Sequence, residues 1–480
     1  MLKIKRIPVF FLIAFFGLLF AQDFLSSCGG NTPAGQIISA VLQIGSDDWK
    51  MPVDVNNAGK NATQADYYHF GWQSFIAANW PADPTYRGKP DTTKRIGALD
   101  AQGNPLSVVW EAWQEQYEIF LPGGKNPGPW NQPGEGCDGG SLGMKRLAAF
   151  SKTDTSGVVN DAFDEATGQP LIDQWSQYVR YEVRVSESEY NYYVTNSYYD
   201  ADSQIVAVQQ NRFVGFPKGN QTIPGLPAWS QFGATEIKAS WRVFPDNATA
   251  AEKSRYFRTK AILVDSYGNC SDTAEVGLIG LHILRLTPST GATWYWASFE
   301  QVDNLSLQPQ FGGTLPAHPN FNTNPPVMYG DSGYSYKPAP IKYGQPLPAP
   351  KPVGVSAPPF RSTDPLLDSI NMAYNKMLAG TPFQFYQMIG TVNPPYAGQT
   401  NPTIDSVPGN KYPAVAVNTA QMANSTMETY GVKSNCVTCH MFGYPQLPPN
   451  YPTPYSSSLQ VFTFLPGLAE SSGAAAKKKK

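Results

Sequence analysis

Between residues 323 and 362, proline recurs so often that neither a helix nor an interior strand can form. The stretch includes Asn324-Pro325-Pro326, Lys337-Pro338-Ala339-Pro340 and Pro348-Ala349-Pro350-Lys351-Pro352. Proline lacks a backbone N–H, breaks helices and is confined in sheets to edges and bulges. We therefore expect an extended connector over residues 323–362 that separates two differently built parts of the chain.

Before the connector, hydrophobicity alternates with a period of two. Ile237, Ala239 and Trp241 alternate with Glu236 and Lys238, and similar runs occur at 179–185, 260–265, 277–286 and 293–299. This alternation is typical of antiparallel strands. Two helices are expected ahead of them, at 65–78 and 108–120. We expect a β-rich domain, a sandwich or an open barrel, over residues 28–322.

After the connector, the pattern is helical. Apolar residues from Leu366 to Met377 recur at helical spacing behind Asp364-Pro365, and Gly380 ends the run. Further helical segments are expected from 381 to about 390 and over 418–430. The predicted fold class is α+β, rich in loops and proline. A small, mainly helical domain covers 363–460, and a tail covers 461–480.

The segment Cys436-Val437-Thr438-Cys439-His440 carries the strongest chemical signal. Two cysteines separated by two residues and followed by histidine form the attachment pattern of c-type haem. The thiols of Cys436 and Cys439 form thioethers with the haem vinyl groups, and His440 is the proximal iron ligand. We expect one covalently attached haem c, and the small C-terminal domain to be its domain.

Other interpretations of this cysteine pair fit less well. A zinc site needs a second Cys/His pair at ligand spacing, whereas Cys28, Cys137 and Cys270 are solitary. A thioredoxin-like redox pair belongs at the end of a strand that opens a helix, which this segment lacks. A structural disulfide between the two motif cysteines is the remaining alternative.

The first 27 residues have the layout of a secretory signal peptide. Three basic residues occur before Ile7, and an uninterrupted apolar run extends from Val9 to Ala21. Leu25-Ser26-Ser27-Cys28 resembles a bacterial lipobox, which would place lipid on Cys28, although cleavage after Ala21 is an alternative. We expect export to the periplasm or outer cell envelope of a bacterium, with possible membrane attachment through that lipid.

The remaining two cysteines make an even pair in an oxidising compartment. If Cys28 carries lipid and the motif cysteines carry haem, Cys137 and Cys270 are left to form a disulfide. In the chain-entropy view, closing so long a loop contributes roughly 4 to 5 kcal/mol before any strain.

The distal iron ligand has to come from upstream of the motif, because Met441 adjoins His440 too closely to cross the ring. His282, in the middle of a predicted strand beside Gly280, and Met427 are the candidates. For residues of either kind, ordinary core packing is the commoner role. His318 and His69 lie beside loop-like sequence and rank lower.

Charge argues against nucleic acid as a partner. Charged residues make up 15% of the chain, against about a quarter in typical domains, and the net charge is −2. No basic stripe is present, and binding to nucleic acid requires one.

Several motifs together resemble those of a family of exported bacterial cytochrome c proteins, over about residues 65–445. The matching pieces are Trp72-Gln73-Ser74-Phe75, Asn79-Trp80-Pro81, Val109-Trp110-Glu111-Ala112-Trp113, Lys238-Ala239-Ser240-Trp241-Arg242-Val243, Gly280-Leu281-His282-Ile283, Trp296-Ala297-Ser298-Phe299-Glu300-Gln301-Val302-Asp303-Asn304, Tyr386-Gln387-Met388-Ile389-Gly390-Thr391 and Asn424-Ser425-Thr426-Met427-Glu428-Thr429-Tyr430. The strand after His282 departs from the family pattern, because Arg285 and Leu286 stand where a second histidine and a lysine are usual. The resemblance implies a haem protein.

Two functions fit these expectations. The first is electron transfer at the bacterial cell envelope by an exported monohaem c-type cytochrome, with a redox protein as partner. The alternative is a haem c redox enzyme, peroxidase-like or acting on another small molecule, whose β-rich domain forms the substrate pocket. A surface-binding lipoprotein with a vestigial haem is a third class.

Overall fold

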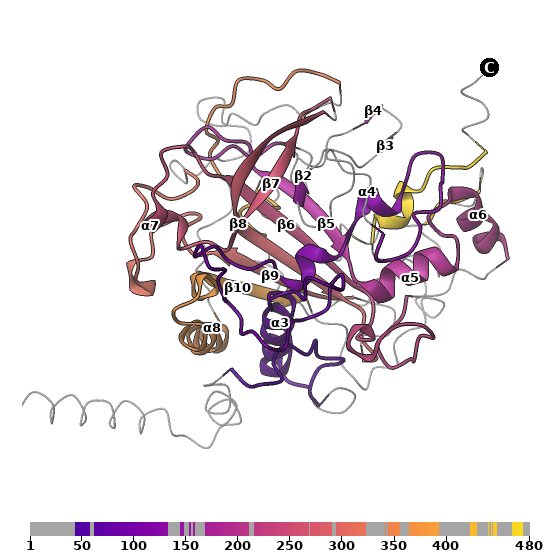
Figure 1. Cartoon of the computed structure of the whole chain (residues 1–480), viewed down its shortest axis with the longest axis horizontal. Helices are drawn as coiled ribbons and strands as arrows, with labels where there is room; N and C mark the ends of the chain where they lie inside the picture. Colours follow the sequence, from indigo (N-terminus) through magenta and orange to yellow (C-terminus); the bar gives the residue numbers. More distant parts are fainter. Residues whose placement is uncertain are drawn as a thin grey trace, which may run out of the picture.

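A computed structural model gives one twisted, mostly antiparallel sheet with helices packed against one of its faces (Figure 1). It describes residues 44–57, 62–132, 145–147, 153–154, 157–158, 169–210, 216–267, 269–289, 294–322, 341, 344–355, 364–392, 423–429, 440, 443, 445–448 and 463–473. The α-helices are α3 (Gln64–Ala78), α4 (Gln116–Ile119), α5 (Glu187–Thr195), α6 (Ala201–Gln209), α7 (Ala250–Lys253) and α8 (Pro365–Met377). The strands are β1 (Gln114–Glu115), β2 (Lys145–Leu147), β3 (Thr153–Asp154), β4 (Gly157–Val158), β5 (Arg180–Val185), β6 (Thr235–Val243), β7 (Arg258–Val264), β8 (Cys270–Arg285), β9 (Tyr295–Gln301) and β10 (Tyr386–Val392).

The long strand β8 organises the sheet. Along one edge it pairs with β6, which continues through β5 to β1. Its other edge is shared, because residues 270–277 pair with β7 and residues 280–285 pair with β9. β10 extends the sheet beyond β9, and β2 joins β7 in parallel. The described strands thus form one eight-stranded sheet and the separate β3–β4 pair, instead of the expected sandwich or barrel.

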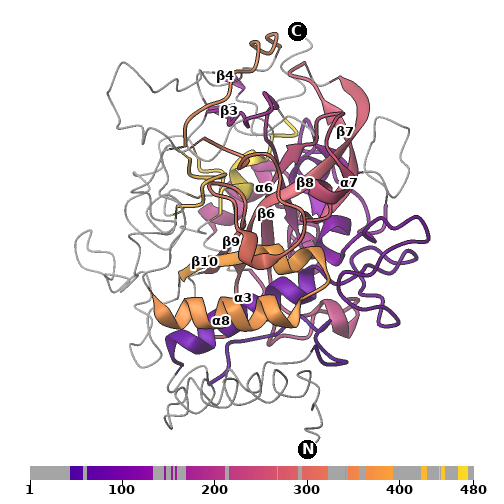
Figure 2. The ribbon, with the colours of Figure 1, turned by 90° about the vertical axis from the view of Figure 1, so that its left-hand side faces the viewer.

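Helices α3 and α8 cover one face of the sheet and pack side by side (Figure 2). α3 begins at a capping box in which Thr63 accepts from the Asp66 amide and Asp66 accepts from the Thr63 amide. The Trp72 ring stacks on Tyr374 of α8 with centroids 4.9 Å apart. Aromatic contacts therefore join two helices that are nearly three hundred residues apart in the chain.

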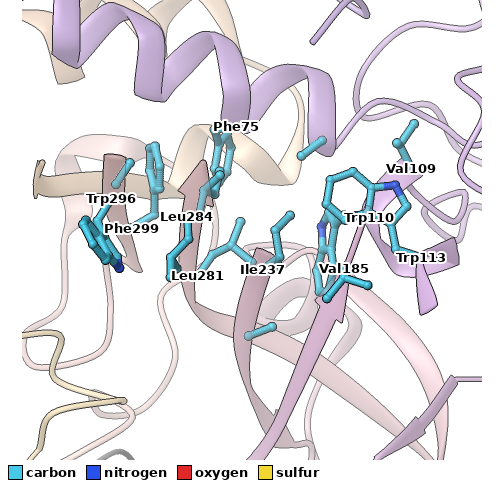
Figure 3. Packing of buried hydrophobic residues seen from close by; sticks show 14 of the residues in the cluster. Phe75, Val109, Trp110, Trp113, Val185, Ile237, Leu281, Leu284, Trp296 and Phe299 are labelled. Carbon is cyan, nitrogen blue, oxygen red and sulfur yellow. The ribbon is translucent and has the colours of Figure 1, made fainter. Parts of the chain in front are cut away.

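The core between these helices and the sheet is aromatic. Phe75 of α3 faces Phe299 of β9, with ring centroids 4.5 Å apart (Figure 3). Farther along the same layer, the Trp110 ring stacks on Trp241 of β6 at 5.9 Å. Side chains of this size bury much apolar surface, and we expect the contacts of this layer to dominate the stability of the fold.

A buried ion pair fastens the loop after β9. The Arg255 Nε and Nη2 atoms donate to Asp303 at 2.6 and 2.9 Å, and both side chains are fully buried. The guanidinium also lies 4.4 Å from the centre of the Phe385 ring. Such a bidentate, desolvated pair holds its two segments in one arrangement, because within the described part of the chain neither charge forms another ion pair.

Residues 463–473 dock on α6. The Ala201 amide donates to the Glu470 carbonyl at 3.1 Å, and the Gln204 side chain donates to the Pro466 carbonyl at 3.0 Å. The Ser472 amide donates to Asp200, which caps the same helix. A stretch that we expected to begin a tail is therefore part of the folded body.

Several predicted elements are confirmed and others are wrong. The helix at 65–78, the helix after Asp364 and the alternating strands are confirmed. Residues 108–120 instead form the 3₁₀ turn Val109–Ala112, β1 and α4. The helix expected from 381 to 390 is the 3₁₀ turn Pro382–Phe385 followed by β10, so residues 364–392 share the main sheet and its core.

Some predicted segments lie outside the described residues. These are the signal peptide, most of the connector and the last residues of the chain. Within the described part, no helix has both the length and the apolarity needed to span a membrane.

Candidate functional site

The sheet face turned away from α3 and α8 carries a patch of polar side chains. Because side chains alternate along strands, the register of β6, β8 and β9 brings them to one face. We call this patch the polar face; it consists of Glu236, Lys238, Ser240, Gly280, His282, Trp296, Ser298 and Glu300. Most of it is buried, which means that other segments cover it.

Residues 423–429 form a turn that seats on the polar face. The Asn424 side chain donates to Ser298 Oγ at 3.1 Å and to the Phe299 carbonyl at 3.0 Å. The Ser425 hydroxyl donates to Glu300 at 2.8 Å, and Thr426 Oγ1 lies 2.6 Å from Ser240 Oγ. The helix predicted for 418–430 is therefore wrong in its described part, since its Asn, Ser and Thr side chains bond locally and to the sheet.

Gly280 makes room for this turn. A Cβ at position 280 would collide with Thr426 Oγ1 and Ser240 Oγ, and would lie 3.2 Å from Asn424 Oδ1. The absence of a side chain at position 280 suggested that the haem ring could approach the strand here. The neighbour that Gly280 admits is instead the polar turn. In the sequence, the turn ends seven residues before Cys436 of the cysteine motif.

His282 lies on the polar face with an unsatisfied imidazole nitrogen. Its ring is buried, and Nε2 has no hydrogen-bond partner among the described residues. Burial lowers the pKa of His282 to about 3, with smaller contributions from the charges of Lys238 and His440. The imidazole is therefore neutral near pH 7, the form that ligates metals.

Glu428 is the nearest acidic neighbour of His282. Its Oε2 atom lies 3.6 Å from His282 Nε2. This distance is too long for a hydrogen bond, and a neutral imidazole makes no ion pair. The same oxygen accepts from the Asn424 amide at 2.8 Å, so the turn holds the carboxylate in place.

His440 lies on the same side of the sheet as His282. Its ring contacts Trp296 of the polar face with centroids 5.9 Å apart, and Phe464 with centroids 5.2 Å apart. Its charge contributes to the lowered pKa of His282, so the two imidazoles are within electrostatic reach of each other. The structure thus brings together two histidines that are more than 150 residues apart in the chain.

The other candidate distal ligands lie elsewhere. Met427 is fully buried in an apolar cluster with Tyr181 and Ile279, where it fills space. His69 lies in α3, behind the opposite face of the sheet, and its Nδ1 is 3.1 Å from the Tyr374 hydroxyl. His318 stacks on Trp175 at 4.2 Å. Of the histidines and methionines proposed as distal ligand, His282 is the one that the structure brings to His440.

Most of the predicted cysteine sites lie outside the described residues. This applies to Cys28, Cys137, Cys436 and Cys439. Cys270, at the start of β8, is disulfide-bonded, and its partner also lies outside the described residues. The pairing of Cys270 with Cys137 stays a prediction.

Sequence reasoning missed the buried carboxylates on this side of the sheet. Burial raises the pKa of Glu300 to about 7, although the Ser425 amide and hydroxyl bind its carboxylate. Glu236 and Glu189 of α5 are buried together nearby. Glu236 alternates with apolar residues along its strand, and no sequence signal indicated that other segments would cover it.

The arrangement offers two imidazoles, one of them unsatisfied, between aromatic rings and buried carboxylates. It contains no ready-made site for a bare ion: among the described residues, no group of three or more His, Cys, Asp and Glu side chains converges. Comparisons of the chain with family models, with curated proteins and with solved structures find no match.

Proposed function

We propose that this chain is an exported monohaem c-type cytochrome that transfers single electrons at the bacterial cell envelope. The observation that carries the proposal is the unsatisfied, buried Nε2 of His282 on the same sheet face as His440. A buried polar atom without a partner is costly and calls for an explanation. Iron ligation by this nitrogen supplies one.

The residues present fit a covalently held haem. Cys436 and Cys439 would provide the thioether bonds, His440 the proximal imidazole and His282 the distal imidazole. Trp296 and Phe464, which contact the His440 ring, would supply apolar surface beside the group. When bound, the haem supplies a one-electron redox centre.

The protein's own residues favour a closed, six-coordinate site. His282 is fixed by strand pairing on both sides, to Lys238 of β6 and to Ser298 of β9. A ligand on a paired strand moves little between redox states, which suits electron transfer and hinders binding of a substrate to the iron. Two histidines also set a lower potential than a histidine and a methionine.

Spectra of the purified ferric protein test the proposal. Protein matured in a bacterial host that attaches haem c should be coloured, low-spin and unchanged by cyanide. His282→Ala should introduce a high-spin component that binds cyanide, and added imidazole should restore the low-spin spectrum. The matched control His318→Ala removes a histidine stacked on Trp175 and should leave the spectrum unchanged. Colourless wild-type protein with the mass of the bare polypeptide would overturn the proposal.

A second candidate is a haem c redox enzyme acting on peroxide or another small molecule. It is favoured by the 3.6 Å approach of Glu428 to His282, because a carboxylate beside an imidazole can serve acid–base chemistry. High-spin wild-type protein that binds cyanide would favour this enzyme over the electron carrier.

Export and lipid attachment complete the proposal. They rest on the first 28 residues of the sequence and on the need to attach haem c outside the cytoplasm. Cys28→Ala should move the protein from the membrane fraction to the soluble fraction, and an unchanged distribution would contradict lipid attachment. A redox protein of the envelope is the proposed partner.

A further inference from the structure

Two glutamates are buried together, and no basic side chain of the described residues bonds to either of them. Glu189 lies on α5 and Glu236 on β6, with 0% and 4% of their surfaces exposed. Besides burial, the charge of Glu236 raises the pKa of Glu189, so the two carboxyl groups lie close to each other. Both oxygens of Glu189, one of Glu236 and the nearby Tyr193 hydroxyl lack a hydrogen-bond partner among the described residues; the Thr235 amide lies near Glu189 but donates to Ser186.

Among the described residues, no cation compensates the charge of this pair. Thr463 hydrogen-bonds to Glu236, and Tyr192 and Tyr193 are ionisable neighbours from α5. The polar face carries three further ionisable residues. The Lys238 Nζ atom lies 5.7 Å from the centre of the Tyr181 ring, His282 lies on β8 and Glu300 lies on β9. On α5, the Glu187 carboxylate accepts a hydrogen bond from the Tyr86 hydroxyl. Arg285, which pairs with Thr235 on the neighbouring strand, donates to the Ser74 hydroxyl.

Two negative charges cannot be held together there. Burial raises the pKa of both carboxyls, and the charge of Glu236 raises that of Glu189 further. Like charges in a low-dielectric site leave one carboxyl protonated, as in the paired carboxylates of acid proteases. One proton placed between the two groups satisfies oxygens that otherwise lack a donor.

The pair connects to His440 through two short routes. Glu236 pairs with Leu284 and Leu284 pairs with Trp296, whose ring contacts His440. Thr463, bonded to Glu236, directly precedes Phe464, whose ring contacts His440. The carboxyl pair thus lies on the same side of the sheet as the proposed proximal ligand, with Leu284 and Trp296 between Glu236 and His440.

We propose that the Glu189–Glu236 pair is a proton-binding site coupled to the oxidation state of the haem iron. This inference rests on the proposed function. With haem bound, one electron taken up from a redox protein would add one negative charge to the buried region. One further proton from solvent would then join the carboxyl pair and restore the charge, with no bond between the pair and the haem. Charges in the interior interact more strongly than charges in water, because the interior screens them poorly.

Redox titrations at a series of pH values test the coupling. The midpoint potential of wild-type protein should fall as pH rises between the proton affinities of the oxidised and reduced states. A tenfold difference between these affinities changes the potential by about 59 mV in total. Haem propionates titrate as well, so the informative quantity is the difference between wild type and variant. Glu189→Gln and Glu236→Gln should each remove the part of the pH dependence that the pair contributes.

Glu187→Gln is the matched control. Glu187 is also a buried glutamate of α5 with a raised pKa, but it lies outside the polar face and accepts from the Tyr86 hydroxyl instead of facing a second carboxyl. This variant should keep the wild-type pH dependence. An unchanged low-spin spectrum shows that each variant is folded. Glu189→Gln is the milder change, because Thr463 bonds to the Glu236 carboxylate, whereas no side-chain hydroxyl of the described residues donates to that of Glu189.

Infrared difference spectra between oxidised and reduced wild-type protein give a test that needs no variant. Reduction should add the C=O stretch of a protonated carboxyl. The proposal is overturned if the potentials of wild type and both glutamine variants depend on pH equally, or if no carboxyl band changes on reduction. Either result in a coloured, low-spin protein leaves the proposed function standing, whereas colourless protein removes the proposed function itself.

Discussion

Substitution of Gly280 by alanine probes the seat of the 423–429 turn. The new Cβ would collide with Thr426 Oγ1 and Ser240 Oγ, two atoms that share a hydrogen bond. Overpacking a well-filled site costs about 1 to 3 kcal/mol. A weakened hydrogen bond adds about 1 kcal/mol. We therefore expect Gly280→Ala to lower the free energy of unfolding by about 2 to 4 kcal/mol.

Equilibrium urea denaturation measures this loss as a lower midpoint at an unchanged slope. Gly45→Ala is the matched control, because a Cβ there meets no atom closer than 3.6 Å. Thr426→Ala removes the atom nearest the new methyl group, so the double variant should be less destabilised than the sum of the two single variants. A Gly280→Ala protein within about 0.5 kcal/mol of wild type would refute the reasoning, because the turn would then not depend on the absence of a side chain.

Three further predictions follow. Asp303→Ala leaves the buried Arg255 guanidinium without its carboxylate and should lower the free energy of unfolding, measured by urea denaturation, by about 3 to 5 kcal/mol. Asp47→Ala removes an exposed ion pair and should cost under about 1 kcal/mol. Equal losses in the two variants would contradict the role given to the buried pair. The folded state holds a proton on Glu300 at pH values where the unfolded chain has released it, so the free energy of unfolding of wild type should fall as pH rises from about 4.5 to about 7. Across that window, Glu300→Gln should gain up to about 3 kcal/mol in stability relative to wild type. Stability curves of wild type and variant that run parallel would argue against this assignment. Peptide mapping without reduction should link Cys270 to Cys137, and replacing both should cost roughly 4 kcal/mol; a link to another cysteine would disprove the pairing.

The sequence predicted local structure where periodicity and burial agree. The strand containing Ile237 and the helix after Asp364 were found because each presents one apolar face to the core. β10 was missed because Pro382 resembles a helix start, whereas the strand is stabilised by pairing with distant β9. Such non-local contacts leave no trace in a local pattern.

The candidate site shows the same division. The motif containing His440 and the strand position of His282 can be read directly from the sequence, but their proximity depends on how segments on the polar face are placed. Alternating polar residues such as Glu236 ordinarily face water on one side of an antiparallel sheet. Here the turn at 423–429 and residues near Thr463 cover that side, which converts expected surface groups into buried ones.

The docking of residues 463–473 on α6 bears on the order of events during maturation. In the sequence, the two motif thiols come between the turn seated on the sheet and this docked stretch, and hydrogen bonds hold both of these flanking segments in the folded protein. Under the proposed function, haem has to be attached to the thiols while the flanking segments still leave them accessible. We therefore expect attachment to precede the docking of residues 463–473 on α6.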